Sequence, residues 1–479
     1  MSKENKNVVG SVLDILKSID MGQPLHFGLM TPKQGNFNKT LALLSKQSQE
    51  TSVATGFATT QSMTTSGYDF LQLEDSSVLF EGRLYASALK RASIMRANRG
   101  SKHCEATLQT LLGESEGDYA VWMLKDNEMG AIRDPMGMQP LYFGENSDIV
   151  AYATNQTTLW KLGIKESKSF PPGTLGFVNK KGFRFRQVKI LSYTKPKQIT
   201  LEEAAQTLQA LLTEAVRCRV QDLKEVAVAF SGGLDCSIIA YLAAMQGIKV
   251  SLLHVSLENQ PETEEALKAA KALDLPMYIQ LFKESDVEAA LPRVVELIEE
   301  PDPIKAAIGV PFYWLALQAT QAKFQTILAG QGADEMFAGY QRYVNQVCKD
   351  KVEAVYRTIY HDVCTLHESN LERDRKIMGY YDIELRCPFV SHPIAQFALG
   401  LPLECKIEPN SDTLRKLVLR KTAKTLGMPE SIVNKPKKAI QYSTGINNAV
   451  KQIAKENAKS MGEYIKELFE HQRASIIPK

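Results

Sequence analysis

The sequence predicts two domains, an α+β domain followed by an α/β domain with an open parallel sheet and a mostly helical C-terminal part. The first prediction depends on short apolar runs separated by turn residues in the N-terminal third. The second depends on apolar runs that alternate with helical stretches from residue 200 to about residue 330, which is typical of βαβ units. The 479 residues are enough for two or three domains with a large core.

The composition is that of an ordinary globular protein, with 44% hydrophobic and 23% charged residues. A net charge of +3 with mixed signs gives no reason to expect nucleic acid or a membrane as a partner. No apolar run reaches the length of a membrane span and no signal peptide opens the chain. The seven scattered cysteines form no C-x-x-C pair, so we expect reduced thiols and a cytoplasmic location.

The first domain is predicted to occupy residues 1–185. Helical spacing appears at residues 7–19, 86–96 and 104–112, and a region rich in Thr, Ser and Gly follows the first of these to about residue 70. Four apolar runs bounded by turn residues predict strands, at residues 78–80, 119–124, 129–132 and 175–178. The basic stretch 186–199, which contains Pro196, is predicted to be a linker.

The second domain is predicted to occupy residues 200–479. Thr200 is a good N-cap and Glu203 is placed to complete a capping box. The strands and helices expected after it are 226–230, 237–246, 249–255, 263–273, 277–281, 286–299, 310–322 and 325–329. Residues 340–479 are expected to be mostly helical with charged faces.

The stretch between the first strand and the first helix of that alternation, Ser231 to Ser237, carries the clearest functional signal. Gly232 and Gly233 end the apolar strand, and a helix follows. A glycine-rich turn before a helix N-terminus presents backbone N–H groups and the positive end of the helix dipole to an anion. The stretch has no lysine and not the spacing of a Walker A loop, and the alternative is a plain strand–turn–helix corner.

This stretch resembles the pyrophosphate-binding loop of ATP-pyrophosphatases, S-G-G-x-D-S. The resemblance implies that the loop holds the β and γ phosphates while ATP is cleaved between the α and β phosphates. Cys236 stands in place of the last serine of the motif, which removes one hydroxyl contact and leaves the backbone donors. The residues implied to contact ATP here are Ser231, Gly232, Gly233, Asp235, Cys236 and Ser237.

Further stretches extend the resemblance in chain order. They are 299–313, 328–340, 384–389, 416–420 and 434–439. Together with the loop they resemble the synthetase domain of asparagine synthetases and their β-lactam-synthetase relatives, over most of residues 200–445. The resemblance implies a class II glutamine amidotransferase-like first domain, an Ntn-hydrolase-like sandwich, followed by an ATP-pyrophosphatase (PP-loop) synthetase domain.

The resemblance implies ATP and Mg²⁺ as cofactors. Asp235 and Asp334 offer hard carboxylate oxygens just after strand ends, where an open α/β sheet binds ligands, and both could instead be helix N-caps. Lys437 matches the family lysine that stabilises charge late in the reaction, and Lys416 is implied to contact pyrophosphate. On local grounds each lysine could equally belong to a solvated surface.

Three positions are implied to line the nucleotide through backbone and apolar contacts: Ala229, Val255 and Gly330. Gln331 stands where asparagine synthetases often have an acid and β-lactam relatives a tyrosine. A neutral amide can bind substrate but cannot serve as a base, so another group must deprotonate the amine.

The first domain resembles the glutaminase half of the same family through residues 131–142 and 170–173. A glutaminase of this type needs a cysteine directly after the initiator methionine, and this chain has Ser2 there. The family's Asn-Gly-Glu becomes residues 81–83, Glu-Gly-Arg, and His103 replaces an acid that would hold the glutamine amine. We therefore expect that the chain does not hydrolyse glutamine, and that Cys104 is a structural thiol.

These observations predict an ATP-dependent, AMP- and pyrophosphate-forming carbon–nitrogen ligase that adenylates aspartate or a related amino acid. The nitrogen would come from ammonia, from a separate ammonia-supplying protein, or from another amine. Two alternatives stay open: a β-lactam-synthetase-like ligase that closes an amide within one molecule, and a catalytically silent nucleotide-binding or regulatory protein. A homodimer is a further possibility, since the first domain could serve as a scaffold.

Overall fold

The computed structural model describes residues 25–30, 53–54, 57–60, 68–72, 76–85, 104–125, 128–147, 150–179, 182–347, 349, 352–408, 414–436 and 444–476. Contacts between Cα atoms divide the chain into two compact units. The first comprises residues 1–190, 379–382 and 469–479, and the second comprises residues 191–378 and 383–468.

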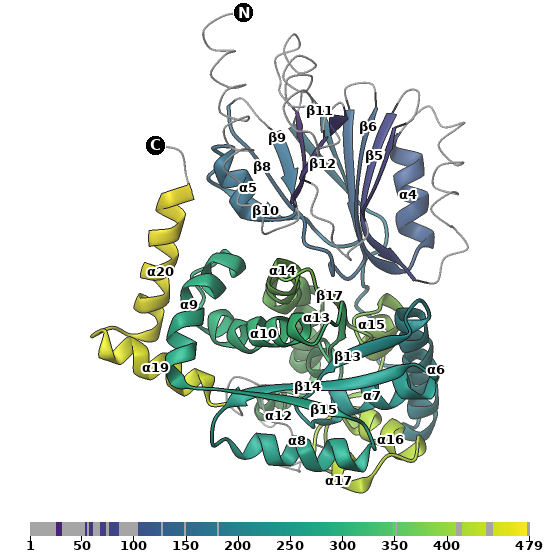
Figure 1. Ribbon diagram of the computed structural model, residues 1–479. Helices are drawn as coiled ribbons and strands as arrows, with labels where there is room; N and C mark the ends of the chain where they lie inside the picture. Colours follow the sequence, from purple (N-terminus) through teal and green to yellow (C-terminus); the bar gives the residue numbers. More distant parts are fainter. Residues whose placement is uncertain are drawn as a thin grey trace, which may run out of the picture. The chain divides into compact units, whose positions relative to one another are not determined.

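The first unit contains two six-stranded antiparallel sheets (Figure 1). The strand order of one sheet is β10-β8-β9-β1-β3-β2. Its strands are β1 (Leu25–Met30), β2 (Val53–Ala54), β3 (Phe57–Thr60), β8 (Tyr142–Glu145), β9 (Val150–Ala153) and β10 (Ser167–Ser169). The order of the other sheet is β12-β11-β7-β6-β5-β4. Its strands are β4 (Tyr68–Gln72), β5 (Ser76–Leu84), β6 (Gly117–Lys125), β7 (Glu128–Arg133), β11 (Thr174–Asn179) and β12 (Gly182–Gln187).

The two faces of the second of these sheets bury different side chains, because successive residues of a strand point to opposite sides. On one face Trp122 packs in a cluster with Tyr152 of the other sheet. On the opposite face the neighbouring Val121 packs in a cluster with Leu111 of helix α4 (Cys104–Glu114). Helix α5 (Gln156–Lys161) contacts strands β8, β9 and β10. The first unit is therefore a sandwich of two sheets, with one buried cluster between the sheets and another between the second sheet and α4.

The strands predicted at residues 78–80, 119–124, 129–132 and 175–178 are confirmed as β5, β6, β7 and β11, and the helix predicted at 104–112 is confirmed as α4. Strands β1 to β4 fall in or next to the region rich in Thr, Ser and Gly, where the sequence predicted none. The helices predicted at 7–19 and 86–96 lie outside the described residues.

The second unit is built on a five-stranded parallel sheet with the order β15-β14-β13-β16-β17. Its strands are β13 (Glu225–Ala229), β14 (Lys249–Leu257), β15 (Met277–Phe282), β16 (Thr326–Leu328) and β17 (Glu384–Arg386). The chain builds outward from β13 through β14 to β15, and then returns to add β16 on the other side of β13. This reversal of strand order opens a crevice at the carboxyl ends of β13 and β16.

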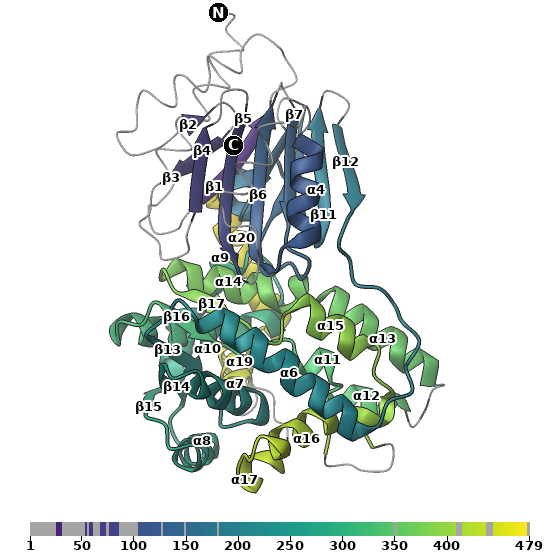
Figure 2. The ribbon, with the colours of Figure 1, turned by 90° about the vertical axis from the view of Figure 1, so that its right-hand side faces the viewer.

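Helices cover both faces of this sheet. In Figure 1, α9 and α10 lie on one side of strands β13 to β15, and α7 and α8 lie on the other. α6 contacts α7, and Figure 2 shows it beside the sheet. The helices of the α/β part are α6 (Leu201–Val220), α7 (Leu234–Met245), α8 (Pro261–Ala272), α9 (Glu284–Ile298), α10 (Pro303–Gln321) and α11 (Ala333–Met336).

The C-terminal part is mostly helical, as predicted. Its elements are α12 (Gln341–Val347), α13 (Val352–Cys364), the π-helical turn η1 (His367–Leu371), α14 (Glu372–Tyr380), α15 (His392–Leu399), the 3₁₀ turn η2 (Leu403–Cys405), α16 (Leu417–Thr425), α17 (Glu430–Val433), α19 (Ile446–Glu456) and α20 (Met461–Ile476). α14 and α20 contain residues of both compact units.

Two helix starts differ from the prediction by more than two residues. α10 begins at Pro303 and not at residue 310, because the Asp302 side chain caps it by accepting the backbone N–H groups of Ile304 and Lys305. α7 begins at Leu234, so Asp235 stands in the first turn of the helix and not in the preceding loop. The capping box predicted at the start of α6 is confirmed.

Candidate functional site

A cavity of about 210 Å³ opens in the second unit at the reversal of strand order. Its wall comes from the ends of β13, β14 and β16, from α10, and from residues at the start of α16. Most of the residues implied by the resemblance to contact the nucleotide or metal line this cavity. They are Ala229, Ser231, Gly233, Asp235, Cys236, Val255, Gly330, Gln331, Asp334 and Lys416.

The glycine loop closes tightly against α8. Gly232 has φ +66°, and a Cβ atom added there would lie 2.7 Å from the Cα atom of Ala266. Only glycine fits a position that combines a left-handed backbone with such a close approach. Gly233 is the N-cap of α7 and carries no side chain over the helix N-terminus, so the positive end of this helix faces the loop.

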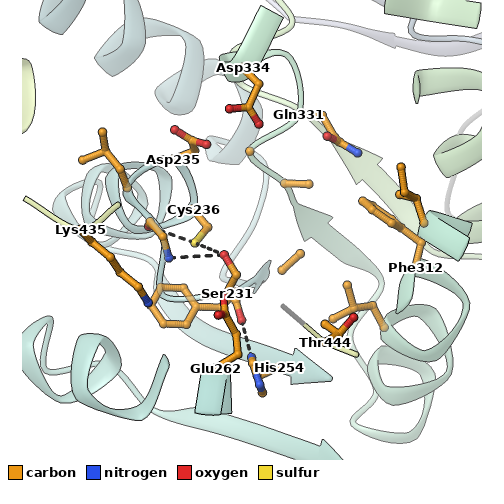
Figure 3. A pocket seen from close by; sticks show the side chains of 18 of the residues that line it. Ser231, Asp235, Cys236, His254, Glu262, Phe312, Gln331, Asp334, Lys435 and Thr444 are labelled. Atoms are coloured by element: carbon orange, nitrogen blue, oxygen red, sulfur yellow. Dashed lines mark hydrogen bonds between the residues drawn. The ribbon is translucent and has the colours of Figure 1, made fainter. Parts of the chain in front are cut away.

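The loop holds its own polar side chains through internal contacts. The Ser231 Oγ accepts the backbone N–H of Gly233 at 3.4 Å and lies 3.5 Å from the Cys236 Sγ. The Cys236 thiol donates to the Gly233 carbonyl at 3.3 Å. The thiol therefore stabilises the loop, while the serine hydroxyl stays on the cavity wall (Figure 3).

Lys416 joins the two aspartates that the sequence assigned to a metal. Its Nζ lies 2.6 Å from the Asp235 Oδ2 and 2.7 Å from the Asp334 Oδ1. The lysine side chain is 3% exposed and the two carboxylates are 14% and 16% exposed. Figure 3 shows the two carboxylates side by side at one end of the cavity. Lys416 adopts a left-handed backbone, φ +61°, a strained conformation that is common at functional positions.

Gly339 makes this cluster possible, and sequence reasoning missed it. A Cβ atom at Gly339 would lie 2.0 Å from the Asp334 Oδ1 and 2.3 Å from the Lys416 Cε. Gly330 plays a similar part, because its Cβ would lie 3.0 Å from the Cβ of Asp235. Both glycines belong to the quoted stretch 328–340. Glycine is needed at both positions because the charged side chains approach the backbone too closely to leave room for a Cβ atom.

The donor set suits a hard divalent cation. Two carboxylates contact the same ammonium group, and Mg²⁺ binds oxygen ligands of this kind. Among the residues that the structure describes, no group of three or more His, Cys, Asp or Glu side chains could hold a metal. A magnesium ion at this point would therefore need water and phosphate oxygens to complete its coordination.

A second polar group lines the cavity beyond the aspartates. The Gln331 side-chain amide donates to the Asp374 Oδ2, and the Arg373 Nε donates to the Asp374 Oδ1 at 2.7 Å. Burial raises the pKa of the Asp374 carboxyl, while Arg373 works in the opposite direction. Sequence reasoning missed Arg373 and Asp374, which belong to a helix with charged residues and lie outside every quoted motif.

His254 of β14 also lines the cavity. Its Nδ1 lies 2.9 Å from the carbonyl oxygen of Phe230, and its Nε2 lies 3.1 Å from the Thr263 Oγ1. Burial lowers the pKa of this imidazole, which favours the neutral ring. A neutral His254 donates to the carbonyl and accepts from the threonine, so it connects the end of β13 to α8.

The remaining sequence-based site residues lie as follows. Gly232 and Ser237 do not line the cavity, and Ser237 is fully buried in α7. Lys437 lies outside the described residues. Its neighbour Lys435 lines the cavity and forms an ion pair with Glu265 at 3.2 Å.

Glu384 and Arg386, from the quoted stretch 384–389, form an ion pair. The Arg386 Nη2 lies 2.8 Å from the Glu384 Oε2, and the two side chains are 1% and 6% exposed. Neither residue lines the cavity.

The comparison with known proteins agrees with this geometry. The chain matches the asparagine synthase (Asn_synthase) family model over residues 207–357 and 349–476, which include the cavity and its glycine loop. The chain belongs to the asparagine synthase family. The members of this family are ATP-dependent amide ligases that act on small-molecule substrates.

Curated relatives agree with the family assignment. The chain is 28% identical over 404 residues to a putative glutamine-hydrolysing asparagine synthetase of Methanocaldococcus jannaschii, and the match covers 74% of each chain. It is 25% identical over 381 residues to a probable glutamine-hydrolysing asparagine synthetase of Dictyostelium discoideum, covering 72% of this chain and 66% of that protein. A solved glutamine phosphoribosylpyrophosphate amidotransferase from B. subtilis aligns over 86% of this chain and 97% of its own, at 12% identity. Its TM-score of 0.28 is too low to support an argument.

Among the described residues, none of the helices combines the length and apolar character needed to cross a bilayer. The five cysteines described with their side chains, Cys218, Cys236, Cys364, Cys387 and Cys405, are free thiols.

In the first unit of this family member, the residues quoted for the glutaminase resemblance form a closed polar cluster. The Asp134 carboxylate accepts backbone N–H groups of Met136, Met138 and Gln139 at 2.9–3.0 Å. The Gln139 side-chain amide donates to the Glu81 Oε1 at 2.5 Å. Glu81 is 5% exposed and Asp134 is fully buried.

Arg133 completes this cluster. Its guanidinium donates to the carbonyl oxygens of Gln139, Phe170 and Gly137 and to the Ser169 hydroxyl, at 2.6–2.9 Å. The side chain is fully buried. Ser2 and His103 lie outside the described residues, and nothing is described of the Cys104 side chain.

Proposed function

We propose that this family member adenylates a carboxylate of an amino acid such as aspartate, and that it takes its nitrogen from ammonia or another amine and not from glutamine. The observation that carries the proposal is the pairing of Asp235 and Asp334 through Lys416, beside a glycine loop at the reversal of strand order. The β-lactam alternative has no specific support, because Gln331 is not the tyrosine of those relatives.

In the proposed reaction, one carboxylate oxygen of the acid attacks the α-phosphorus of ATP and the bond to the β-phosphate oxygen breaks, which releases pyrophosphate. The amine nitrogen then attacks the acyl carbon, AMP leaves, and a proton leaves the nitrogen. The backbone N–H groups of residues 231–234 would bind the β and γ phosphates at the start of α7.

Asp235 and Asp334 would hold Mg²⁺, which neutralises charge on the leaving pyrophosphate. Lys416 already lies between these carboxylates, so we expect its ammonium to turn to the phosphates when nucleotide and metal bind. Ala229, Val255 and Gly330 would line the nucleotide, and Lys437 would stabilise charge in the second step.

Gln331 supports a binding role and not a base role. Its amide nitrogen is committed to Asp374, and an amide has no pKa near neutrality. With free ammonia as the substrate, the unprotonated fraction supplies the nucleophile, and no base is needed before attack.

The closed cluster of the first unit supports independence from glutamine. The position that the family gives to an oxyanion donor is occupied by Glu81, whose carboxylate is bound to Gln139. We propose that the first domain, residues 1–185, serves as a scaffold for a homodimer or for a separate ammonia-supplying protein, with residues 186–199 as the linker to the synthetase domain at 200–479.

Pyrophosphate release from ATP tests the proposal. Release should require both a carboxylate and Mg²⁺, and the complete reaction should proceed with ammonium chloride but not with glutamine. Equal rates with glutamine and ammonium would refute the proposal that the first domain does not hydrolyse glutamine. No release with any amino acid or β-amino acid would favour the catalytically silent alternative.

A further inference from the structure

The wall of the cavity contains a guanidinium that is only partly bonded. Arg373 of α14 lines the cavity and is 3% exposed. Its Nε donates to Asp374 at 2.7 Å, and its Nη1 reaches the Ser369 carbonyl and the Asn370 Oδ1 at 3.3 Å each. Within the part of the chain that the structure describes, its Nη2 has no hydrogen-bond partner.

A buried guanidinium N–H without a partner is unfavourable, and proteins ordinarily satisfy such donors. Here the donor belongs to a residue on the wall of the substrate cavity, so a ligand can satisfy it. Arg373 therefore differs from Arg386, which is equally buried but lies away from the cavity and is paired with Asp222 and Glu384.

The surroundings favour an anionic ligand at Arg373. Asp374 bonds the guanidinium through the Nε, which leaves the Nη2 open to a ligand. Gln331, on the other side of Asp374, is neutral. The ring of Phe312 lies with its centroid 5.9 Å from the Arg373 Cζ, and Figure 3 shows Phe312 and Gln331 on the same side of the cavity.

We propose that Arg373 binds a second carboxylate of the acceptor acid, so that this enzyme selects dicarboxylates and amino dicarboxylates over acids with a single carboxylate. The reacting carboxylate would face the glycine loop and the aspartate pair, while the other would accept a hydrogen bond from the Arg373 Nη2. Arginine suits this role because its planar fork matches a carboxylate and its charge is permanent. The inference rests on the proposed function and names a specificity-determining residue within it.

Asp374 and Gln331 act as positioning residues in this arrangement. Asp374 fixes the guanidinium through the Nε, which leaves the Nη2 for the ligand. Gln331 bonds the second oxygen of Asp374 and so fixes the carboxylate in turn. An acid at position 331 would place a further negative charge next to this group, which explains why a neutral amide suits this chain.

The test compares acids in pairs that differ by one carboxylate: aspartate against 3-aminopropanoate, and succinate against propanoate. Pyrophosphate release should show a KM for each diacid that is roughly 100-fold lower than for its partner, because a buried donor left unpaired penalises the shorter acid. Arg373→Met should raise the KM for aspartate by a similar factor and leave that for 3-aminopropanoate within about 2-fold.

Two further variants make the result specific. Arg373→Lys keeps the charge but not the planar fork, so it should restore part of the selectivity. Arg357→Met removes an arginine that is 74% exposed and should leave both KM values unchanged. ATP affinity, measured by calorimetry, should be the same in all of these proteins, which shows that the nucleotide end of the cavity is intact.

The outcomes separate the two proposals. If the wild-type protein releases no pyrophosphate with any acid, the proposed function fails. If it releases pyrophosphate but treats the paired acids alike, or if Arg373→Met weakens both acids of a pair equally, the function stands and the assignment of Arg373 is wrong. The wild-type comparison does not depend on the folding of any variant.

Discussion

The two units of this chain use buried charge in opposite ways. In the first unit, Arg133 and Asp134 are fully buried, and they form hydrogen bonds with the chain's own backbone and with one serine hydroxyl. In the second unit, Asp235, Asp334 and Lys416 lie on the wall of a cavity and bond one another.

This difference between the units indicates which buried charges can still bind a ligand. The charges of the first unit fix a turn and are already satisfied, so a ligand has little to gain there. The charges of the second unit are held together by one ammonium, and under the proposed function Mg²⁺ and phosphate would take over its contacts. Substitutions should therefore cost stability in the first unit and activity in the second.

The largest effect is expected for Asp235→Asn. Loss of one of two carboxylates should lower carboxylate-dependent pyrophosphate release by at least about 1,000-fold, because the metal then has one protein ligand. The melting temperature should change little, since the side chain lies on a cavity wall. Glu225→Gln, on the same strand–helix unit but paired at the surface with Lys249, serves as the control and should keep wild-type activity. Near-normal release by Asp235→Asn would remove this residue from the site.

Arg133→Met should have the next largest effect, and on stability. Its removal leaves three buried carbonyl acceptors and one part-buried hydroxyl without their donor, which we expect to lower the unfolding free energy by about 3–5 kcal/mol. Urea unfolding measures this change. A matched substitution is Arg184→Met, whose side chain lies over the Phe177 ring at the unit's surface and should cost less than about 1 kcal/mol. A small effect of Arg133→Met on the unfolding free energy would contradict the claim that buried charges of the first unit serve stability.

Gly339→Ala tests whether activity of the second unit depends on the position of the Asp334 carboxylate. The added Cβ would overlap Asp334 and Lys416, so the carboxylate must move, and pyrophosphate release should fall by roughly 10–100-fold. Gly379→Ala is the control, because no atom lies within 4 Å of a Cβ at that helical position. Equal activity of the two variants would show that the position of Asp334 is not critical.

The smallest effect concerns Lys406, a lysine that contrasts with Lys416. It is fully buried, it has no hydrogen-bond partner among the described residues, and burial lowers its pKa to about 7. Between about pH 7 and pH 10 the unfolded chain holds one more proton at this site than the folded chain. Stability should therefore rise with pH across this range.

Lys406→Met removes the amine and should flatten that rise, with a gain of roughly 1–3 kcal/mol in unfolding free energy at pH 7.5. Chemical unfolding at several pH values measures both proteins. Lys424→Met, on the solvent-facing side of α16, is the control and should retain the wild-type slope. An unchanged slope in Lys406→Met would show that Lys406 does not cause the rise of stability with pH.

Much of the second unit could be predicted because local signals agree with the fold there. Thr200 and Glu203 form the predicted capping box, and every strand from β13 to β16 was predicted within two residues of its bounds. The loop after β13 and the loop after β16 meet at the reversal of strand order, as the chemistry of their residues indicated.

The remainder depends on contacts that local sequence does not encode. The ion pair of Lys416 with Asp235 joins residues 181 positions apart, and the reason for Gly339 appears only when both side chains are in place. Arg373 and Asp374 stood in a charged helix without a motif. Strands β1 to β4 escaped prediction because Ser, Thr and Gly dominate the region that contains most of them, so the apolar alternation of a buried strand is weak.

One measurement tests the central claim most directly: exchange of radiolabelled pyrophosphate into ATP in the presence of Mg²⁺ and a dicarboxylate such as aspartate, without any amine. If the glycine loop and the aspartate pair support adenylation, exchange should depend on the acid and should vanish in Asp235→Asn. Exchange that proceeds equally without the acid, or that persists in Asp235→Asn, would contradict the proposed role of this cavity.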